Sequence, residues 1–174
     1  MMTNRLVLTP VGMDLRIAMH SSRQAFADLL GVRLPEGWPE FPEAFAPSAD
    51  TSPPPWTGYL FAGRDSCALI GNGGFVSSPD TTGTVEIGYE IAPEFRDQGY
   101  ATEAAGALVE IAREAGARAV IAHSLPFPNP SNAVMRKLGM TYDAELGNGD
   151  DKVWRWRVTL ASPQGSASTG ADRR

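Results

Sequence analysis

The spacing of hydrophobic residues changes twice in the first third of the chain. Residues 5–11 form a short run with alternate leucines, which predicts a strand. Asp14 can then cap a helix that runs toward Leu30. Over residues 31–58, repeated prolines exclude one continuous helix, and scattered aromatic residues argue against simple disorder. This segment, called the excursion below, is predicted to fold irregularly, with one short helix near residues 42–46.

The middle of the chain contains three β-rich runs separated by turn-forming residues. They cover residues 59–64, 67–76 and 85–91, and three consecutive strands of this kind predict an antiparallel meander. The second run contains the glycine-rich stretch IGNGGF, which no helix follows. Its glycines therefore indicate a bulge or a close backbone contact and not a nucleotide fingerprint.

The last third of the chain returns to helical spacing. Apolar residues recur at helical intervals over residues 98–115 and stop at Gly116, which predicts a long helix. A strand follows from Arg118, and a shorter helix then has Asn129 as its N-cap, Pro130 at its first position and Gly139 at its exit. Two further β runs complete the pattern. Together the elements predict an α/β (α+β) fold, a mixed sheet with helices on its faces.

Length and composition indicate one domain. The chain has 174 residues and is 43% hydrophobic, enough for one sizeable core. We predict a single domain over residues 1–160 and a disordered tail over residues 161–174, which are polar and poor in hydrophobic residues.

Charge and cysteine content narrow the functional classes. A formal net charge of -5 argues against a nucleic-acid surface. One cysteine, Cys67, excludes an intramolecular disulfide and a cysteine metal cluster, which fits a cytoplasmic protein. No apolar run reaches the roughly eighteen residues of a membrane span, and no export signal is indicated. We therefore expect neither a nucleic-acid partner nor a membrane partner, and no metal.

The stretch EFRDQGYATEAA places a glycine at the start of the long predicted helix. The first amides of a helix have no intrahelical partner and its dipole is positive there, so this end favours an anion. Gly99 lets the backbone approach a ligand, and Arg96 can add positive charge. No Walker lysine follows. The pattern predicts a phosphate or pyrophosphate that is bound but not transferred.

The order of motifs over residues 85–140 resembles the GNAT superfamily of acyl-CoA-dependent N-acetyltransferases, and within it the RimJ/RimL-type branch. The resemblance rests on the strand VEIGYEIAP, the loop RDQGYA with its helix, a further strand, and the helix NPSNAVMRKLGM. It implies the GNAT fold, a mostly antiparallel sheet of six to seven strands with a splayed strand pair that holds acyl-CoA. It also implies acetyl-CoA as cosubstrate, with its pyrophosphate on the amides of residues 96–102 and its pantetheine beside Ile91 and Ala92. The cofactor-binding residues implied in this way are Ile91, Ala92, Arg96, Asp97, Gln98, Gly99, Tyr100, Ala101, Thr102, Asn129 and Asn132.

The same resemblance points to two catalytic residues. Glu86 matches the glutamate of the E-I-G-Y motif, a proposed base that acts directly or through water. Strand alternation puts Glu86, Gly88 and Glu90 on one face, so Glu90 is the reserve candidate. Ser131 matches the serine that RimL-like members place near the coenzyme sulfur. The alternative is that Ser131 only supports the first turn of its helix. Many relatives use a tyrosine four residues later, but this chain has Met135 there.

Other polar residues near the motifs leave alternatives open. Pro128 stands where family members often have an asparagine that contacts pantetheine; Asn129 or Asn132 can substitute, although Asn129 also suits a helix cap. His123 is a structural residue or a second base. Lys137 and Arg136 either reach the ribose phosphate of the coenzyme or form a solvated helix face.

The function implied is transfer of an acetyl group to a primary amine, either a protein N-terminus or a small molecule, by direct attack on the thioester. The alternative is a non-catalytic acyl-CoA-binding or sensing module, and a different acyl donor such as succinyl-CoA is a further possibility. We expect a monomer or a homodimer. The excursion is expected to form the acceptor wall, with little part in coenzyme binding, because acidic and aromatic residues together suit a cation. Those residues are Glu36, Trp38, Glu40, Phe41, Glu43, Phe45, Asp50 and Trp56.

Overall fold

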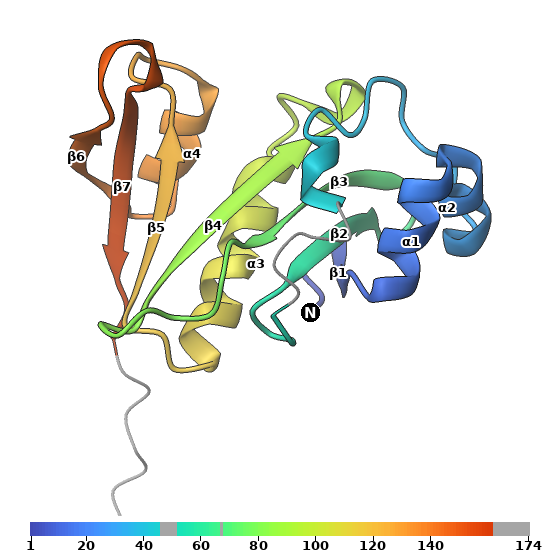
Figure 1. Cartoon of the computed structure of the whole chain (residues 1–174), viewed down its shortest axis with the longest axis horizontal. Helices are drawn as coiled ribbons and strands as arrows, with labels where there is room; N and C mark the ends of the chain where they lie inside the picture. Colours follow the sequence, from blue (N-terminus) through green and yellow to red (C-terminus); the bar gives the residue numbers. More distant parts are fainter. Residues whose placement is uncertain (46–51, 67, 162–174) are drawn as a thin grey trace, which may run out of the picture.

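The fold is built on one sheet, with β6 and β1 at its two edges (Figure 1). In the computed structural model, which describes residues 1–45, 52–66 and 68–161, this sheet has seven strands in the order β1-β2-β3-β4-β5-β7-β6. β4 and β5 pair in parallel and all other neighbours pair antiparallel, which confirms the predicted class and the antiparallel meander β2-β3-β4. The strands are β1 (Leu6–Pro10), β2 (Gly58–Gly63), β3 (Leu69–Phe75), β4 (Thr84–Ile91), β5 (Ala119–Ser124), β6 (Thr141–Leu146) and β7 (Val153–Thr159).

Helices cover both faces of the sheet. The α-helices are α1 (Met13–Ser21), α2 (Arg23–Leu30), α3 (Tyr100–Glu114) and α4 (Pro130–Lys137), and short 3-10 helices are η1 (Pro42–Phe45), η2 (Pro93–Phe95) and η3 (Gly149–Asp151). The short helix expected in the excursion is η1. As predicted, α4 has Asn129 as its N-cap, whose side chain accepts from the N–H of Asn132, and Pro130 at its first position.

The helix predicted after β1 is divided in two. Ser22 leaves the helical conformation (φ -170°, ψ 154°), and its side chain accepts from the N–H of Ala25, so it caps α2. The prediction that Asp14 caps the first helix is wrong. Gly12 holds the N-cap position without a side-chain bond, and Asp14 lies in the first turn. Its negative charge still favours that end of the helix, because the dipole is positive there.

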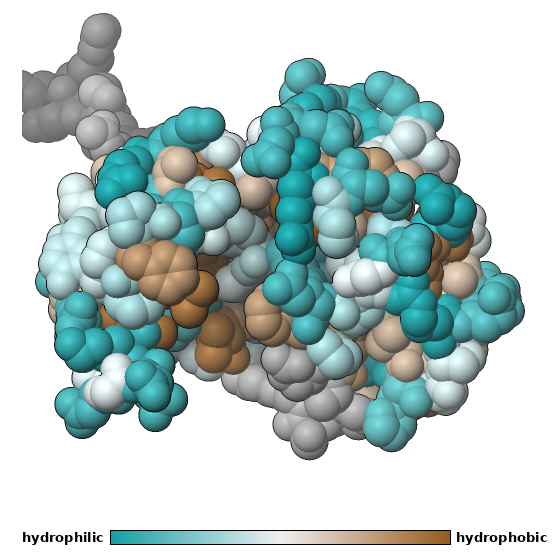
Figure 2. Space-filling view, turned by 90° about the horizontal axis from the view of Figure 1, so that it is seen from above, coloured by the Kyte–Doolittle hydropathy of each residue, from teal (hydrophilic) through white to brown (hydrophobic). Residues whose placement is uncertain are grey.

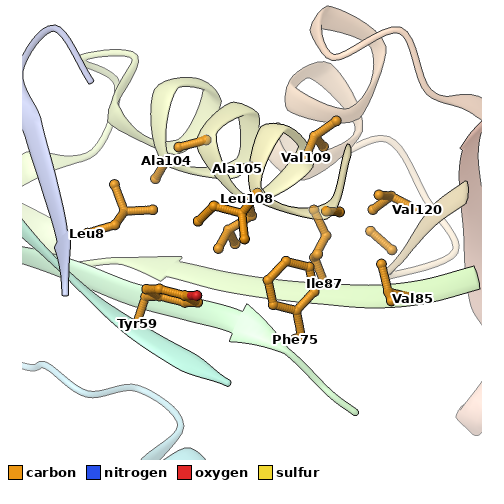
Figure 3. Packing of buried hydrophobic residues seen from close by; sticks show 14 of the residues in the cluster. Leu8, Tyr59, Phe75, Val85, Ile87, Ala104, Ala105, Leu108, Val109 and Val120 are labelled. Carbon is orange, nitrogen blue, oxygen red and sulfur yellow. The ribbon is translucent and has the colours of Figure 1, made fainter. Parts of the chain in front are cut away.

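The main core lies between the sheet and α3, as Figure 3 shows. Leu108 is fully buried and points from α3 toward Ile87 and the rest of β4. Ala104 and Ala105, also fully buried, keep this face of α3 thin, so the helix lies close to the strands. Because burial of one leucine side chain contributes about 1.5–3 kcal/mol, this contact fixes α3 firmly beside β4.

A second hydrophobic cluster occupies the other face of the sheet. Phe26 of α2, Trp38 of the excursion and Phe45 of η1 contact one another, with ring centroids 5.5–5.9 Å apart. All three side chains are buried. The excursion is therefore packed on the sheet over the residues described, as its aromatic content predicts.

The parallel pair β4 and β5 separates soon after it forms. Register pairs join Thr84–Glu86 of β4 only with Ala119–Ile121 of β5. Beyond Glu86, β4 leans away from β5 toward α1 and α2 (Figure 1). This confirms the splayed strand pair. The space between the two strands, called the opening below, lies next to the N-terminus of α3.

Glycines in β3 permit close backbone packing beside the opening. A Cβ atom on Gly73 would lie 2.5 Å from the carbonyl oxygen of Gly88 in β4, and one on Gly71 would collide with the backbone of Glu90. The interpretation of IGNGGF as a close backbone contact is thus confirmed.

Some of the predictions fall on residues that the structure does not describe. The predicted tail lies outside the described residues except for Ala161, so the division into a domain and a tail stays a prediction, and Asp50 and Cys67 also lie outside them. Over the described residues, no helix is both long and apolar enough to cross a bilayer. In the same ranges, no three histidine, cysteine or acidic side chains come together as a metal site would require.

Candidate active site

The edge of β4 that faces the opening carries backbone groups without a strand partner. Ala92 donates its N–H to Ile70 O (2.9 Å), and Val76 donates its N–H to Glu86 O (3.0 Å), so even-numbered residues of β4 bond to β3. Because hydrogen-bonding directions alternate along a strand, Ile87, Tyr89 and Ile91 direct their N–H and C=O groups into the opening.

The two residues predicted to contact pantetheine differ in this respect. Both backbone groups of Ala92 are engaged, since its carbonyl accepts from the N–H of Phe95 (2.9 Å). Ile91 faces the opening, but its carbonyl accepts a hydrogen bond from Nε of Arg96 (3.0 Å). Pairing with pantetheine therefore remains a prediction for Ile91, to which Tyr89 is added. For Ala92, the backbone bonds argue against that role.

The loop before α3 presents a row of backbone N–H groups. Gly99 is the N-cap of α3 with φ 81°, and Asp97 also has a positive φ of 60°. Within the described residues, no hydrogen bond engages the N–H groups from Asp97 to Thr102. They are free for an anion, as expected for a helix N-terminus. Arg96 differs, because its N–H already bonds to Pro93 O (3.3 Å).

Arg5 braces this loop, although no local sequence pattern singles it out. Its Nη1 donates to Gln98 O (2.9 Å), its Nε donates to Glu103 Oε2 (2.7 Å), and its guanidinium lies 4.2 Å from the centroid of the Tyr100 ring. A residue just before β1, almost a hundred positions earlier, thus fixes the entrance of α3. No local pattern could identify this contact, because it depends on β1 lying beside that end of the helix.

A valine in place of Gly99 is expected to abolish the rise in melting temperature that acetyl-CoA produces in the wild type. A φ of 81° is strained for any residue with a side chain, so the loop must rearrange and the amides lose their alignment. The free protein should also melt a few degrees lower. The measurement is thermal denaturation with and without acetyl-CoA. An undiminished shift would show that the pyrophosphate binds elsewhere.

Glu103 should make stability depend on pH. Burial alone would raise the pKa of this carboxyl, but hydrogen bonds from Thr3 and Arg5, together with the Arg5 charge, lower it overall. A lowered pKa stabilises the fold above the ordinary carboxyl range, and the contribution disappears as the pH falls through the lowered value. In denaturant titrations, Glu103→Gln is expected to be less stable than the wild type at pH 7 and to converge with it below about pH 4. Glu114→Gln, at the far end of α3, should show no such convergence.

Glu86 lies where β4 and β5 separate, at the last register pair. Its Oε1 lies 2.8 Å from Nδ1 of His123 on β5, so the two side chains bridge the base of the opening. Both are half-buried. Nε2 of His123 is buried without a partner among the described residues, and a proton there would leave an unsatisfied donor. The favoured tautomer therefore carries its proton on Nδ1 and donates to Glu86.

A cavity of about 390 Å³ lies over Gly88 and Glu90 of β4, on the face of the sheet opposite α3. Gly88, whose missing Cβ would meet nothing within 4 Å, forms part of its floor. The excursion contributes Phe41, Ala44 and Phe45 to its wall. Figure 2, which looks down on the end where β4 and β5 part, shows a hollow between the two sides of the molecule with apolar surface on its walls. As alternation predicts, Gly88 and Glu90 share this face.

Other residues of the predicted acceptor wall have different positions. Trp38 is buried and donates from Nε1 to Asn72 Oδ1 (2.7 Å), behind the cavity. Trp56 packs against Phe75 at 5.1 Å between ring centroids. Glu36 lines a separate surface hollow beside α1.

Glu40 joins the excursion to the loop before α3, which lies 56 positions later in the chain. Its carboxylate lies 2.6 Å from Nη2 of Arg96, and its N–H donates to Glu90 Oε2 (2.8 Å). Burial raises the pKa of the Glu90 carboxyl, while hydrogen bonds from the backbone N–H groups of Glu40 and Phe41 oppose the rise. The excursion thus contacts both the loop before α3 and the acceptor cavity. This contact could not be predicted, because the two segments are far apart in the sequence.

The N-terminus of α4 brings Ser131 near Tyr89 of β4. Burial raises the pKa of Tyr89 to about 12, and the Ser131 hydroxyl beside it acts in the opposite direction. Met135 is buried in the core. Asn129 serves as the helix cap and donates from Nδ2 to Phe127 O (2.8 Å), while Asn132 donates to the same carbonyl (3.1 Å).

The two basic residues of α4 have no contact that points to a coenzyme. Arg136 lies over the Trp156 ring, 5.1 Å from its centroid, and Lys137 is exposed to solvent. This arrangement favours the solvated helix face over a ribose phosphate site.

Several buried polar side-chain atoms without a hydrogen-bond partner in the described part of the chain belong to elements that border the opening. Counted over residues 1–45, 52–66 and 68–161, four buried side-chain atoms have no hydrogen-bond partner, and β4, β5 and α4 carry all of them. They are Tyr89 Oη, Glu90 Oε1, His123 Nε2 and Asn132 Oδ1. Each such group costs about 1–3 kcal/mol when unpaired, and the elements that carry these four atoms are the ones that border the opening.

The fold and this site define an acyltransferase. The sequence matches the family model described as an acetyltransferase (GNAT) domain over residues 5–141, and the chain belongs to that family. The predicted superfamily and enzyme class are thereby confirmed. No curated protein sequence matches the chain at the level that would make it a relative.

Solved structures share the fold at low sequence identity. An acetyltransferase (GNAT family) from Bacillus anthracis is 22% identical with a TM-score of 0.64, over 91% of this chain and 96% of that one. RimL, a ribosomal L7/L12 alpha-N-protein acetyltransferase solved with coenzyme A, is 17% identical with a TM-score of 0.65, over 91% and 96%. Spermidine N-acetyltransferase from Vibrio cholerae, solved with CoA and spermine, is 13% identical with a TM-score of 0.61, over 91% and 97%.

Proposed function

We propose that this enzyme transfers an acetyl group from acetyl-CoA to a primary amine that reaches the thioester through the cavity over Gly88. The observation that carries the proposal is the row of N–H groups at the start of α3 that make no hydrogen bond within the described residues, next to the edge of β4 that β5 leaves free. The free N–H groups from Asp97 to Thr102 would hold the pyrophosphate. Pantetheine would lie along the exposed edge of β4.

The residues at the base of the opening fit the proton transfers that the reaction needs. Glu86 would take a proton from the incoming ammonium, directly or through water, while His123 holds its other oxygen at 2.8 Å. The N–H of Tyr89, which faces the opening, would polarise the thioester carbonyl. The neutral amine then attacks the carbonyl carbon, the tetrahedral intermediate loses a second proton from nitrogen to water, and the C–S bond breaks to give the amide and a thiolate.

The proposed acceptor is a primary amine, and both a peptide N-terminus and a small molecule are candidates for it. Phe41 and Phe45 give the cavity apolar surface, and Glu90 and the buried Arg16 also line it. Among fold neighbours, RimL is a protein N-terminal acetyltransferase and the Vibrio cholerae enzyme was solved with spermine. Both a peptide N-terminus and a small amine therefore belong in the substrate panel.

The proposal is tested by free-thiol release from acetyl-CoA with a panel of peptides, polyamines, amino-acid amides and aminoglycosides. We expect saturable release above the hydrolytic background with at least one acceptor. The rival, a non-catalytic acyl-CoA sensor, predicts a thermal shift with acetyl-CoA but no release with any amine. Succinyl-CoA in the same assay tests the choice of acyl donor.

A further inference from the structure

Departure of coenzyme A leaves a negative charge on sulfur that the protein must stabilise. Met135 occupies the helical position where a tyrosine could donate, and Ser131 is the donor that the sequence suggests. We propose that the phenol of Tyr89 donates a hydrogen bond to the coenzyme sulfur as it leaves, and that Ser131 positions this phenol. The inference rests on the proposed function.

The backbone geometry of β4 places Tyr89 beside the path of the coenzyme. Its N–H and C=O face the opening, at the middle of the edge from Ile87 to Ile91 that has no strand partner. A pantetheine chain paired with this edge must pass Tyr89. The sequence motif drew attention to Glu86, three residues earlier, and gave the tyrosine no role.

The side chain of Tyr89 lies on the face of the sheet that α3 and α4 cover. Its ring packs against the main core, beside the first turn of α4, where Ser131 lies next to the hydroxyl. The hydroxyl oxygen is buried, and within the described residues no hydrogen bond of ordinary geometry reaches it, although the Ser131 hydroxyl lies close enough to lower the pKa of Tyr89. Because a buried hydroxyl normally finds a partner, the missing one is expected to be a ligand atom.

The acidity of Tyr89 decides what the hydroxyl can do. With its pKa raised to about 12, the phenol stays protonated at every physiological pH. A thiol titrates near 8.5, about three units lower, so full transfer of the phenol proton to the thiolate is unfavourable. The proton therefore stays on oxygen. The C–S bond breaks, its electron pair remains on sulfur, Tyr89 stabilises that charge by a hydrogen bond, and solvent protonates the thiolate after release.

This role predicts an unusual combination of effects for Tyr89→Phe. The variant removes one unpartnered buried oxygen and leaves the ring packing, so its melting temperature should equal or exceed that of the wild type. Its kcat should fall about 10- to 100-fold, the range for a hydrogen bond to a charged group. The KM for acetyl-CoA should change little, because the bond strengthens only as charge develops.

The decisive measurement is the pKa of the coenzyme A thiol in its binary complex, obtained from the pH dependence of coenzyme A affinity and from thiolate absorbance. Tyr89→Phe is expected to raise that pKa by about one unit, Ser131→Ala by less, and the exposed Tyr142→Phe not at all. An unchanged thiol pKa in Tyr89→Phe, or a larger rise in Ser131→Ala, would overturn the proposal.

The binary complex separates this inference from the proposed function, because it needs no acceptor. Wild-type protein that binds coenzyme A and shows the Tyr89-dependent thiol pKa, yet releases no thiol with any amine, would refute acetyl transfer and retain the contact. Failure to bind coenzyme A would refute both.

Discussion

Leucine in place of Gly88 is expected to abolish acetyl transfer and to leave acetyl-CoA binding intact. A Cβ atom at this position meets nothing within 4 Å, so the strand accommodates a side chain. The added atoms project into the cavity where the amine must approach the thioester. Because displacing a reactant by about 1 Å can cost 100-fold, kcat/KM for the amine should fall at least about 100-fold. The thermal shift with acetyl-CoA should match the wild type.

Two comparisons sharpen this experiment. Gly88→Ala should lie between the wild type and Gly88→Leu, because the obstruction scales with side-chain size. Gly73→Ala, on the neighbouring strand, should instead destabilise the fold, since its Cβ would lie 2.5 Å from the Gly88 carbonyl oxygen. If Gly88→Leu acetylated amines at the wild-type rate, the amine would have to approach the thioester from another side of the sheet.

Glutamine in place of Glu86 is expected to lower kcat by about 100-fold or more at neutral pH. The carboxamide keeps the size of the side chain and can still accept from Nδ1 of His123, but it cannot take a proton. Activity should recover partly as the pH rises, because more of the amine is then neutral without help. The measurement is the pH dependence of kcat with a fixed amine at saturating acetyl-CoA.

The control for this variant is Glu110→Gln, an exposed change on α3 that should leave the profile unaltered. A wild-type pH profile in Glu86→Gln would assign proton removal to Glu90, to His123 or to bulk water. Glu90 is then the first to test, because its Oε1 is buried without a partner and it lines the acceptor cavity.

Local patterns in the sequence predict most of the elements and part of the site. Period-two alternation correctly put Glu86 and Glu90 on one face of β4, and Asn129 with Pro130 correctly began α4, because these features depend only on near neighbours. The break at Ser22 was missed, since the apolar spacing continues across it and only the cap geometry ends α1.

Contacts between distant segments could not be predicted in the same way. The brace from Arg5 to Gln98, the pair of Glu40 with Arg96, and the bridge from Glu86 to His123 each join elements that meet only in the folded sheet. The contact between the excursion and the loop before α3 was not predicted for this reason, and its small part in coenzyme binding stays a prediction. No role was predicted for Tyr89, because strand alternation places its side chain on the core face, where packing alone accounts for a tyrosine.

A crystal structure of the full chain with acetyl-CoA would show directly whether the start of α3 and the opening hold the coenzyme. We expect pyrophosphate oxygens within hydrogen-bonding distance of N–H groups between Asp97 and Thr102, and the thioester in the opening between β4 and β5. Arg96 should then have left the carbonyl of Ile91, which it contacts in the free protein. If acetyl-CoA bound away from the N-terminus of α3, and Arg96 still bonded to the carbonyl of Ile91, the proposed coenzyme site would be wrong.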